Sequence, residues 1–118
     1  MAAQKASIRT EVPGPKSVEL GKMREKYLSK GVGIVAPVYI EKAEGSLLYD
    51  VDGNVFIDMG SGIGVNNVGN RPPEVVDAVK AQADKFLHLC FQVTPYESYL
   101  SLAKKLAESA PGKGLSKS

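Results

Sequence analysis

The residues best suited to chemistry form the glycine-rich loop from Gly60 to Gly64, in which glycines at alternate positions leave Ile63 as the only large side chain. Glycine adopts backbone conformations closed to other residues and lets a ligand approach closely. A dinucleotide-binding fingerprint, however, needs the spacing G-x-G-x-x-G leading directly into a helix, and here Pro72-Pro73 delays the next helix. We therefore favour a sharp exit from a hairpin, with phosphate binding as the weaker alternative.

Two other sets of side chains have types that occur in active sites. His88 and Cys90 would need further ligands for a closed zinc site, and the sequence contains no second histidine or cysteine, so we expect them to pack in a core. Asp50, Asp52 and Asp58 resemble paired catalytic carboxylates in type only. Asp52 is explained by a turn that it forms with Gly53. Strand alternation makes Asp50 and Asp58 surface or capping groups. The sequence therefore predicts no catalytic residue and no metal site.

Composition narrows the function classes further. Fifteen lysines and arginines against 13 acidic residues give a net charge of +2 without a dense basic block, so neither nucleic acid nor an anionic membrane is indicated as a partner. No lysine stands out as a buried Schiff-base nucleophile. No apolar run approaches the roughly 20 residues that span a bilayer. A single cysteine and a polar start, MAAQKASIRTEVPG, predict a cytoplasmic location.

The first half of the chain is expected to place a helix before a small sheet. Residues 1–16 are polar, lack periodicity and contain two prolines, so we expect an extended arm. Apolar residues at helical spacing predict a helix over 17–30, which Gly31 would end in the left-handed conformation. A short strand is expected at 38–40, after Pro37.

The clearest structural pattern is a β-hairpin. Strand-forming residues at 47–51 and 54–58 flank Asp52-Gly53, a dipeptide that suits the positive φ angles of a two-residue turn. We expect strand 38–40 to join this hairpin.

Two amphipathic helices are expected to follow. The first begins at Pro73 and runs to about His88, and the second covers 95–110, with Thr94 and Glu97 as a capping box. Each has one apolar face, and together these faces exceed what the small sheet can bury, which favours self-association or a partner. The fold class is therefore α+β: an N-terminal helix, a small antiparallel sheet and two amphipathic helices.

The ordered motifs resemble the N-terminal part of class III pyridoxal-phosphate aminotransferases. The resemblance rests on LYDVDGNVFID at 48–58 and GIGVNNVGN at 62–70, followed by PEVVDAV at 73–79 and LHLCFQV at 87–93. It covers about Pro13 to Gly112 and looks closest to the 4-aminobutyrate aminotransferase branch. The chain departs from the family at Asn70 and Pro72, near which such proteins have histidines.

The resemblance implies a fold-type I transferase dependent on pyridoxal 5'-phosphate (PLP). Residues 17–112 would form the N-terminal segment of the small domain and the start of the cofactor domain, and 113–118 a truncated linker. Ile63 matches a position on the substrate side of the pocket and Gln92 a polar position near the cofactor. The lysine, Gly-Ser turn and aspartate that hold the cofactor in the family do not occur before Ser118, so this chain is expected to be inactive alone.

By the same resemblance, the complete enzyme would be a homodimer. It would transfer an amino group from a donor such as 4-aminobutyrate to a 2-oxo acid such as 2-oxoglutarate. The alternative is a stand-alone, cofactor-free binding or dimerisation module derived from that family. A continuation beyond Ser118 that contains the cofactor motifs would distinguish the two.

Overall fold

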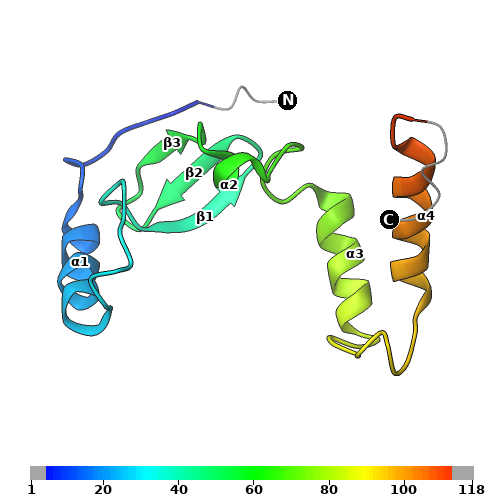
Figure 1. Ribbon diagram of the computed structural model, residues 1–118. Helices are drawn as coiled ribbons and strands as arrows, with labels where there is room; N and C mark the ends of the chain where they lie inside the picture. Colours follow the sequence, from blue (N-terminus) through cyan, green and yellow to red (C-terminus); the bar gives the residue numbers. More distant parts are fainter. Residues whose placement is uncertain (1–4, 113–118) are drawn as a thin grey trace. The chain divides into compact units, whose positions relative to one another are not determined.

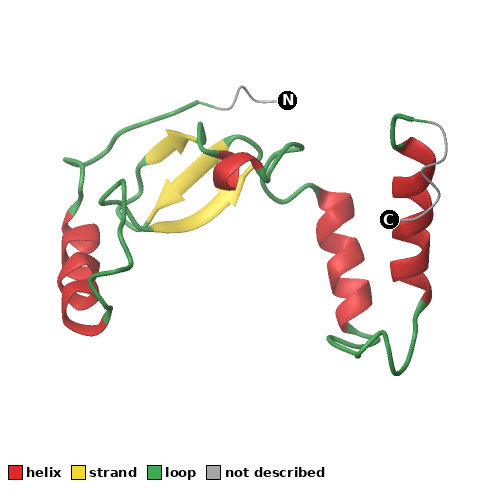
Figure 2. Ribbon diagram, in the orientation of Figure 1, coloured by secondary structure: helices red, strands yellow, loops and turns green. Residues whose placement is uncertain are grey.

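The computed structural model describes residues 5–112, and the chain falls into two compact units, Met1–Ala78 and Val79–Ser118. The expected linker at 113–118 lies outside the described residues. Figures 1 and 2 show helices combined with a single antiparallel sheet, which confirms the α+β class. In chain order the elements are α1 (Pro15–Tyr27), β1 (Ile40–Glu44), β2 (Leu47–Asp50), β3 (Val55–Ile57), α2 (Ser61–Gly64), α3 (Pro73–Ala83) and α4 (Glu97–Ser109).

The sheet has the order β1-β2-β3, with both neighbouring pairs antiparallel. Strand β1 joins the hairpin as expected, but it covers Ile40–Glu44 rather than 38–40. Its side chains are mostly exposed, so it lacks the alternating hydrophobic pattern that marks a half-buried strand. A register shift between Ile40 and Lys42 also interrupts the ladder.

The hairpin turn differs from the expected two-residue form. Asp50 N–H donates to the Asn54 carbonyl at 3.0 Å, and Gly53 N–H donates to the Asp50 carbonyl at 3.1 Å. The loop therefore contains three residues, Val51 to Gly53, and among them only Gly53 has a positive φ, at 83°. This is the arrangement of a turn followed by one left-handed residue, a common three-residue hairpin loop.

The N-terminal arm is extended and held against β3 and the hairpin turn. Ser7 and Val55 exchange backbone hydrogen bonds of 2.9 and 2.7 Å. The amides of Arg9 and Thr10 donate to Asn54 Oδ1 at 2.7 and 3.0 Å. Asn54 thus replaces the ladder partners that an edge segment would otherwise lack.

Helix α1 is shifted towards the N-terminus relative to expectation. It begins at Pro15 and ends at Tyr27, where Leu28 is an extended C-cap, so Gly31 does not end it. Proline at the first helical position is favourable because its missing N–H has no intrahelical partner there. The helix buries only Ser17.

The two later helices also have different ends from those expected. Helix α3 begins at Pro73, as expected, but stops at Ala83 instead of near His88. Helix α4 begins at Glu97 with Tyr96 as an extended N-cap, and no side chain caps it. The expected capping box of Thr94 and Glu97 is therefore wrong.

Few apolar side chains are buried. Leu47 and Val55 are the only buried hydrophobic residues within 5–112, at 5% and 9% exposure, while Ser17, Asp50 and Asn54 are buried polar residues. No hydrophobic residue of α3 or α4 is buried. Within the first unit, Asp50 and Asn54 form a buried polar network at the hairpin. No helix in residues 5–112 has the length and apolar composition to span a membrane.

Candidate functional site

The glycine loop forms a left-handed turn that presents Ile63. Within α2, Gly62 and Ile63 both have φ of 61°, and Ser61 and Gly64 have φ of 45° and 77°. A β-branched residue in this region is sterically unfavourable, and such strained positions cluster at binding and active sites. The Ile63 side chain is 98% exposed. The one large side chain of the loop therefore points away from the rest of the described structure.

Asp58 fixes the entrance to this turn. Its Oδ1 accepts hydrogen bonds from the amides of Gly60 and Ser61 at 3.1 and 2.7 Å. The Asn70 side chain and the Ser61 amide, which donate to the carboxylate, lower the pKa of Asp58. An anion of the chain itself therefore occupies the amides that a phosphate would need, which argues against the phosphate-binding alternative.

Asn70 holds the other side of the loop. Its Nδ2 donates to Asp58 Oδ2 at 2.9 Å and to the Gly45 carbonyl at 3.2 Å. Asn70 and Gly45 also exchange backbone hydrogen bonds of 2.7 and 2.9 Å. The loop is thereby tied to the β1–β2 connection, which orients Ile63 relative to the sheet.

Gln92 belongs to the second compact unit and lies in a turn between α3 and α4. The amides of Val93 and Thr94 both donate to the Cys90 carbonyl at 3.0 Å. The neighbouring Phe91 stacks on Tyr99, with ring centroids 4.3 Å apart. These contacts set the backbone at Gln92, whose side chain is exposed. Ile63 lies in the first unit, so the two predicted pocket residues belong to different units.

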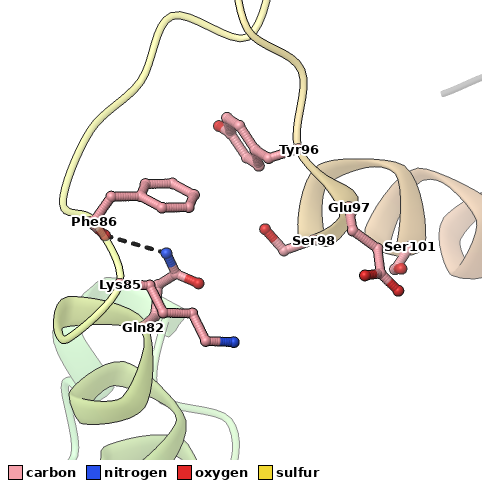
Figure 3. A pocket seen from close by; sticks show the side chains of 7 residues that line it. All are labelled: Gln82, Lys85, Phe86, Tyr96, Glu97, Ser98 and Ser101. Carbon is pink, nitrogen blue, oxygen red and sulfur yellow. Dashed lines mark hydrogen bonds between the residues drawn. The ribbon is translucent and has the colours of Figure 1, made fainter.

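Aromatic rings organise this second unit. Tyr96 makes edge contacts with Phe86 and Phe91 at centroid distances of 5.4 and 5.3 Å. An open pocket of about 340 Å³ lies beside these rings (Figure 3). Its lining residues are Gln82, Lys85, Phe86, Tyr96, Glu97, Ser98 and Ser101. Gln92 does not line this pocket, and Lys85 and Glu97 are exposed, so the pocket brings together no predicted site residue.

The expectation that His88 and Cys90 pack in a core is wrong, because both are exposed. The stretch around them has no regular secondary structure. No group of three or more histidine, cysteine, aspartate and glutamate side chains in residues 5–112 could hold a metal ion.

Asp52 has a role that the sequence analysis missed. Its Oδ1 accepts from the Lys16 amide at 2.7 Å and its Oδ2 from the Ser17 amide at 2.9 Å, so it caps the N-terminus of α1 from the hairpin turn. A Cβ at Gly14 would lie 2.4 Å from Asp52 Cγ, which explains a glycine at this N-cap. The sequence signal was Gly14-Pro15, a helix start without a capping side chain.

Asp50, by contrast, stabilises the hairpin itself. It is 2% exposed, and its Oδ1 accepts from the amides of Asp52 and Asn54 at 3.0 and 2.7 Å. Its Oδ2 accepts from Asn54 Nδ2 at 2.8 Å. The capping interpretation of Asp50 is confirmed, and the surface interpretation is wrong.

The Asp52 cap should make stability depend on acid pH. Loss of hydration raises the pKa of Asp52, but hydrogen bonding from Ser17 and Lys16 outweighs it and holds the pKa below its ordinary value of 3.8. The folded state therefore binds this proton less readily, so the contribution is present above pH 3.8 and is lost as pH falls through the lowered pKa. We expect Asp52→Asn to flatten the fall in melting temperature between about pH 5 and about pH 2. The melting temperature is measured by circular dichroism at each pH. Asp77→Asn, at an exposed position, serves as the control. An equal flattening in both variants would contradict the cap.

Comparisons with known proteins agree with one another. The family model described as aminotransferase class-III matches residues 27–117. The chain is 47% identical over 111 residues to the 4-aminobutyrate aminotransferase of Mycobacterium leprae, a match that covers 94% of this chain and 25% of that protein. It is 44% identical over 91 residues to the 5-aminovalerate aminotransferase of Pseudomonas aeruginosa, covering 77% of this chain and 21% of that protein.

A solved structure shows the same fold. The taurine:2-oxoglutarate aminotransferase from Bifidobacterium kashiwanohense, solved in complex with PLP and glutamate, matches with a TM-score of 0.69 and 28% identity. That match covers 89% of this chain and 22% of the solved one. The chain therefore spans about a quarter of the length of the relatives it matches.

Proposed function

Because this chain belongs to the class III aminotransferase family, we propose that it forms the N-terminal, pocket-bordering part of a PLP-dependent enzyme. That enzyme transfers an amino group from a donor such as 4-aminobutyrate to a 2-oxo acid such as 2-oxoglutarate. The observation that carries the proposal is the 47% identity to a 4-aminobutyrate aminotransferase across 94% of this chain. The named relatives are all aminotransferases, which favours the enzyme over a stand-alone module.

Residues 5–112 do not fit PLP on their own. PLP enzymes use a lysine for the Schiff base and an acidic or arginine partner for the ring nitrogen. Every lysine in residues 5–112 is exposed. Asp50 and Asp58 are committed to hydrogen bonds within the hairpin and the glycine loop. The proposal therefore assigns the cofactor contacts to the part of the enzyme that corresponds to the rest of the relatives' length.

Within this division of roles, Ile63 contributes contact with the substrate. An apolar side chain fixed on a strained turn can pack against the aliphatic part of an amino donor while excluding water from it. Its exposure of 98% and the clamp of Asp58 at the turn support this role. Gln92, held by the turn that follows Cys90, would offer an amide group to the cofactor side of the pocket.

Two further features belong to the proposal. The enzyme would act as a homodimer, and the many exposed hydrophobic side chains of this part supply surface for other segments or a second copy. It would be cytoplasmic, a location that the single cysteine supports.

The test replaces the matching N-terminal part of a relative with this chain. We expect a chimera of the Mycobacterium leprae enzyme that carries the matching residues of this chain to transaminate 4-aminobutyrate. The isolated 118-residue chain should show no transamination and no PLP adduct at one lysine after desalting. A chimera that folds and binds PLP but does not use 4-aminobutyrate would contradict the donor assignment, and a site-specific adduct on the isolated chain would contradict its inactivity.

The role of Ile63 is tested in the same chimera. Pocket contacts of one side chain are worth roughly 1–3 kcal/mol in discrimination between substrates. We expect Ile63→Gln to lower kcat/KM by an amount that depends on donor chain length, measured with 4-aminobutyrate and 5-aminovalerate. The exposed Val68→Gln serves as the matched control. An equal loss with both donors, or none, would reduce Ile63 to a residue that shapes the loop.

A further inference from the structure

A small cavity lies between α1 and the chain that follows it, within the first compact unit. It has a volume of about 150 Å³. Ser17 and Arg24 of α1 line one side, and Ile34 and Tyr39 come from the segment between α1 and β1. The residues named for substrate and cofactor, Ile63 and Gln92, are not among its lining residues.

Three polar side-chain atoms of residues that line this cavity are buried without a hydrogen-bond partner among the described residues. They are Ser17 Oγ, Arg24 Nε and Tyr39 Oη, and within residues 5–112 no other buried side-chain nitrogen or oxygen is in this state. Buried polar atoms are nearly always paired, so each of these three groups has unused hydrogen-bonding capacity for a water, an ion or a polar ligand. All three atoms belong to residues that line the same cavity.

The three groups are not equal. The Ser17 side chain is near enough to Asp52 to help to lower the pKa of that carboxyl, although no hydrogen bond of normal geometry joins them. Arg24 donates from Nη2 to the Val32 carbonyl, which fixes the guanidinium and leaves Nε for another acceptor. Tyr39 Oη lies 3.9 Å from the place where a Cβ on Gly21 would stand, so it rests over the helix surface.

The chemistry of the lining favours an anion with a short apolar part. A guanidinium bonds carboxylates more strongly than neutral acceptors, and a tyrosine hydroxyl can also donate to a carboxylate oxygen. Val18 and Ile34 add apolar wall. A cavity of about 150 Å³ in another protein takes a ligand of benzene's size.

We propose that this cavity binds a small organic carboxylate, with the carboxylate at Arg24 and Tyr39 and the alkyl part against Val18 and Ile34. The site is separate from the substrate contact assigned to Ile63. Glu25 also lines the cavity, and its side chain is exposed. Its negative charge opposes an anion, so neutralising it should strengthen binding.

The experiment uses the 118-residue chain and butyrate as the probe, with butyramide as its neutral counterpart. Titration is followed by amide chemical shifts in NMR. Butyrate should produce saturable shifts at Ser17, Gly21 and Tyr39, and butyramide should bind at least about tenfold more weakly. The readout does not involve transamination, so it can fail while the proposed function holds.

Variants make the assignment specific. Arg24→Gln and Tyr39→Phe should each weaken butyrate binding, the former by about tenfold or more. Glu25→Gln should tighten it, which keeps a test available if Arg24→Gln does not fold. Lys22→Gln removes a positive charge from the same helix outside the cavity and should leave binding unchanged. Shifts that do not saturate, equal binding of butyramide, or an equal effect of Lys22→Gln would mean that the cavity holds only water.

Discussion

Replacing Asn54 by alanine should lower the free energy of unfolding of the first compact unit by at least about 3 kcal/mol. Asn54 is fully buried, and its side chain accepts from the amides of Arg9 and Thr10. It also donates to Thr10 Oγ1 at 2.9 Å and to Asp50 Oδ2 at 2.8 Å. The truncation therefore removes a partner of the buried Asp50 carboxylate and of partly buried groups of Arg9 and Thr10 at once. A buried group left unpaired costs about 1–3 kcal/mol.

Urea unfolding monitored by circular dichroism measures this loss. Asn67→Ala is the matched control, since Asn67 is exposed on the loop that follows α2. A small domain has about 5–15 kcal/mol of stability in total. The Asn54 variant should therefore unfold at a clearly lower urea concentration than the control. Equal midpoints for the two variants would show that the arm and the hairpin do not depend on this side chain.

The second large effect concerns the exposed apolar surface. Helices α3 and α4 leave Val79, Tyr99, Leu100 and Leu106 between 51% and 63% exposed. Exposed apolar surface favours association. We expect the 118-residue chain to self-associate, or to bind a hydrophobic dye strongly, at micromolar concentrations.

Multi-angle light scattering and dye fluorescence measure these two outcomes. Leu106→Lys places a charge on the apolar face of α4 and should reduce both signals, whereas Lys104→Gln on the same helix should not. A strictly monomeric chain that binds no dye would contradict the prediction.

The α+β class and the hairpin could be predicted because their determinants are local. Residues that favour strands flank Asp52-Gly53, and Pro73 marks a helix start whatever surrounds it. Element ends were less predictable. Strand β1 is too exposed to carry an alternating pattern. Helix α4 begins after Tyr96, whose ring contacts Phe86 and Phe91, and not with a cap from Thr94.

In the candidate site, too, features set by the local sequence could be predicted and features set by long-range contacts could not. Ile63 could be singled out because glycines surround it in the sequence, whereas the capping function of Asp52 joins residues 35 positions apart. The cavity at Arg24 could not be anticipated, because its lining comes from segments with no shared motif. Long-range hydrogen bonds of this kind have no local motif in the sequence. The sequence shows only that an expected group is lacking, such as a capping side chain at the start of a helix.

The cap on α1 also determines when that helix can become stable during synthesis. Residues 15–27 leave the ribosome before residue 52, so the amides of Lys16 and Ser17 have no carboxylate to accept from until the hairpin turn has emerged. An isolated helix of 13 residues is marginal in water. The cap of the first helix therefore forms only after the turn between β2 and β3 has been synthesised, although the helix comes first in the sequence.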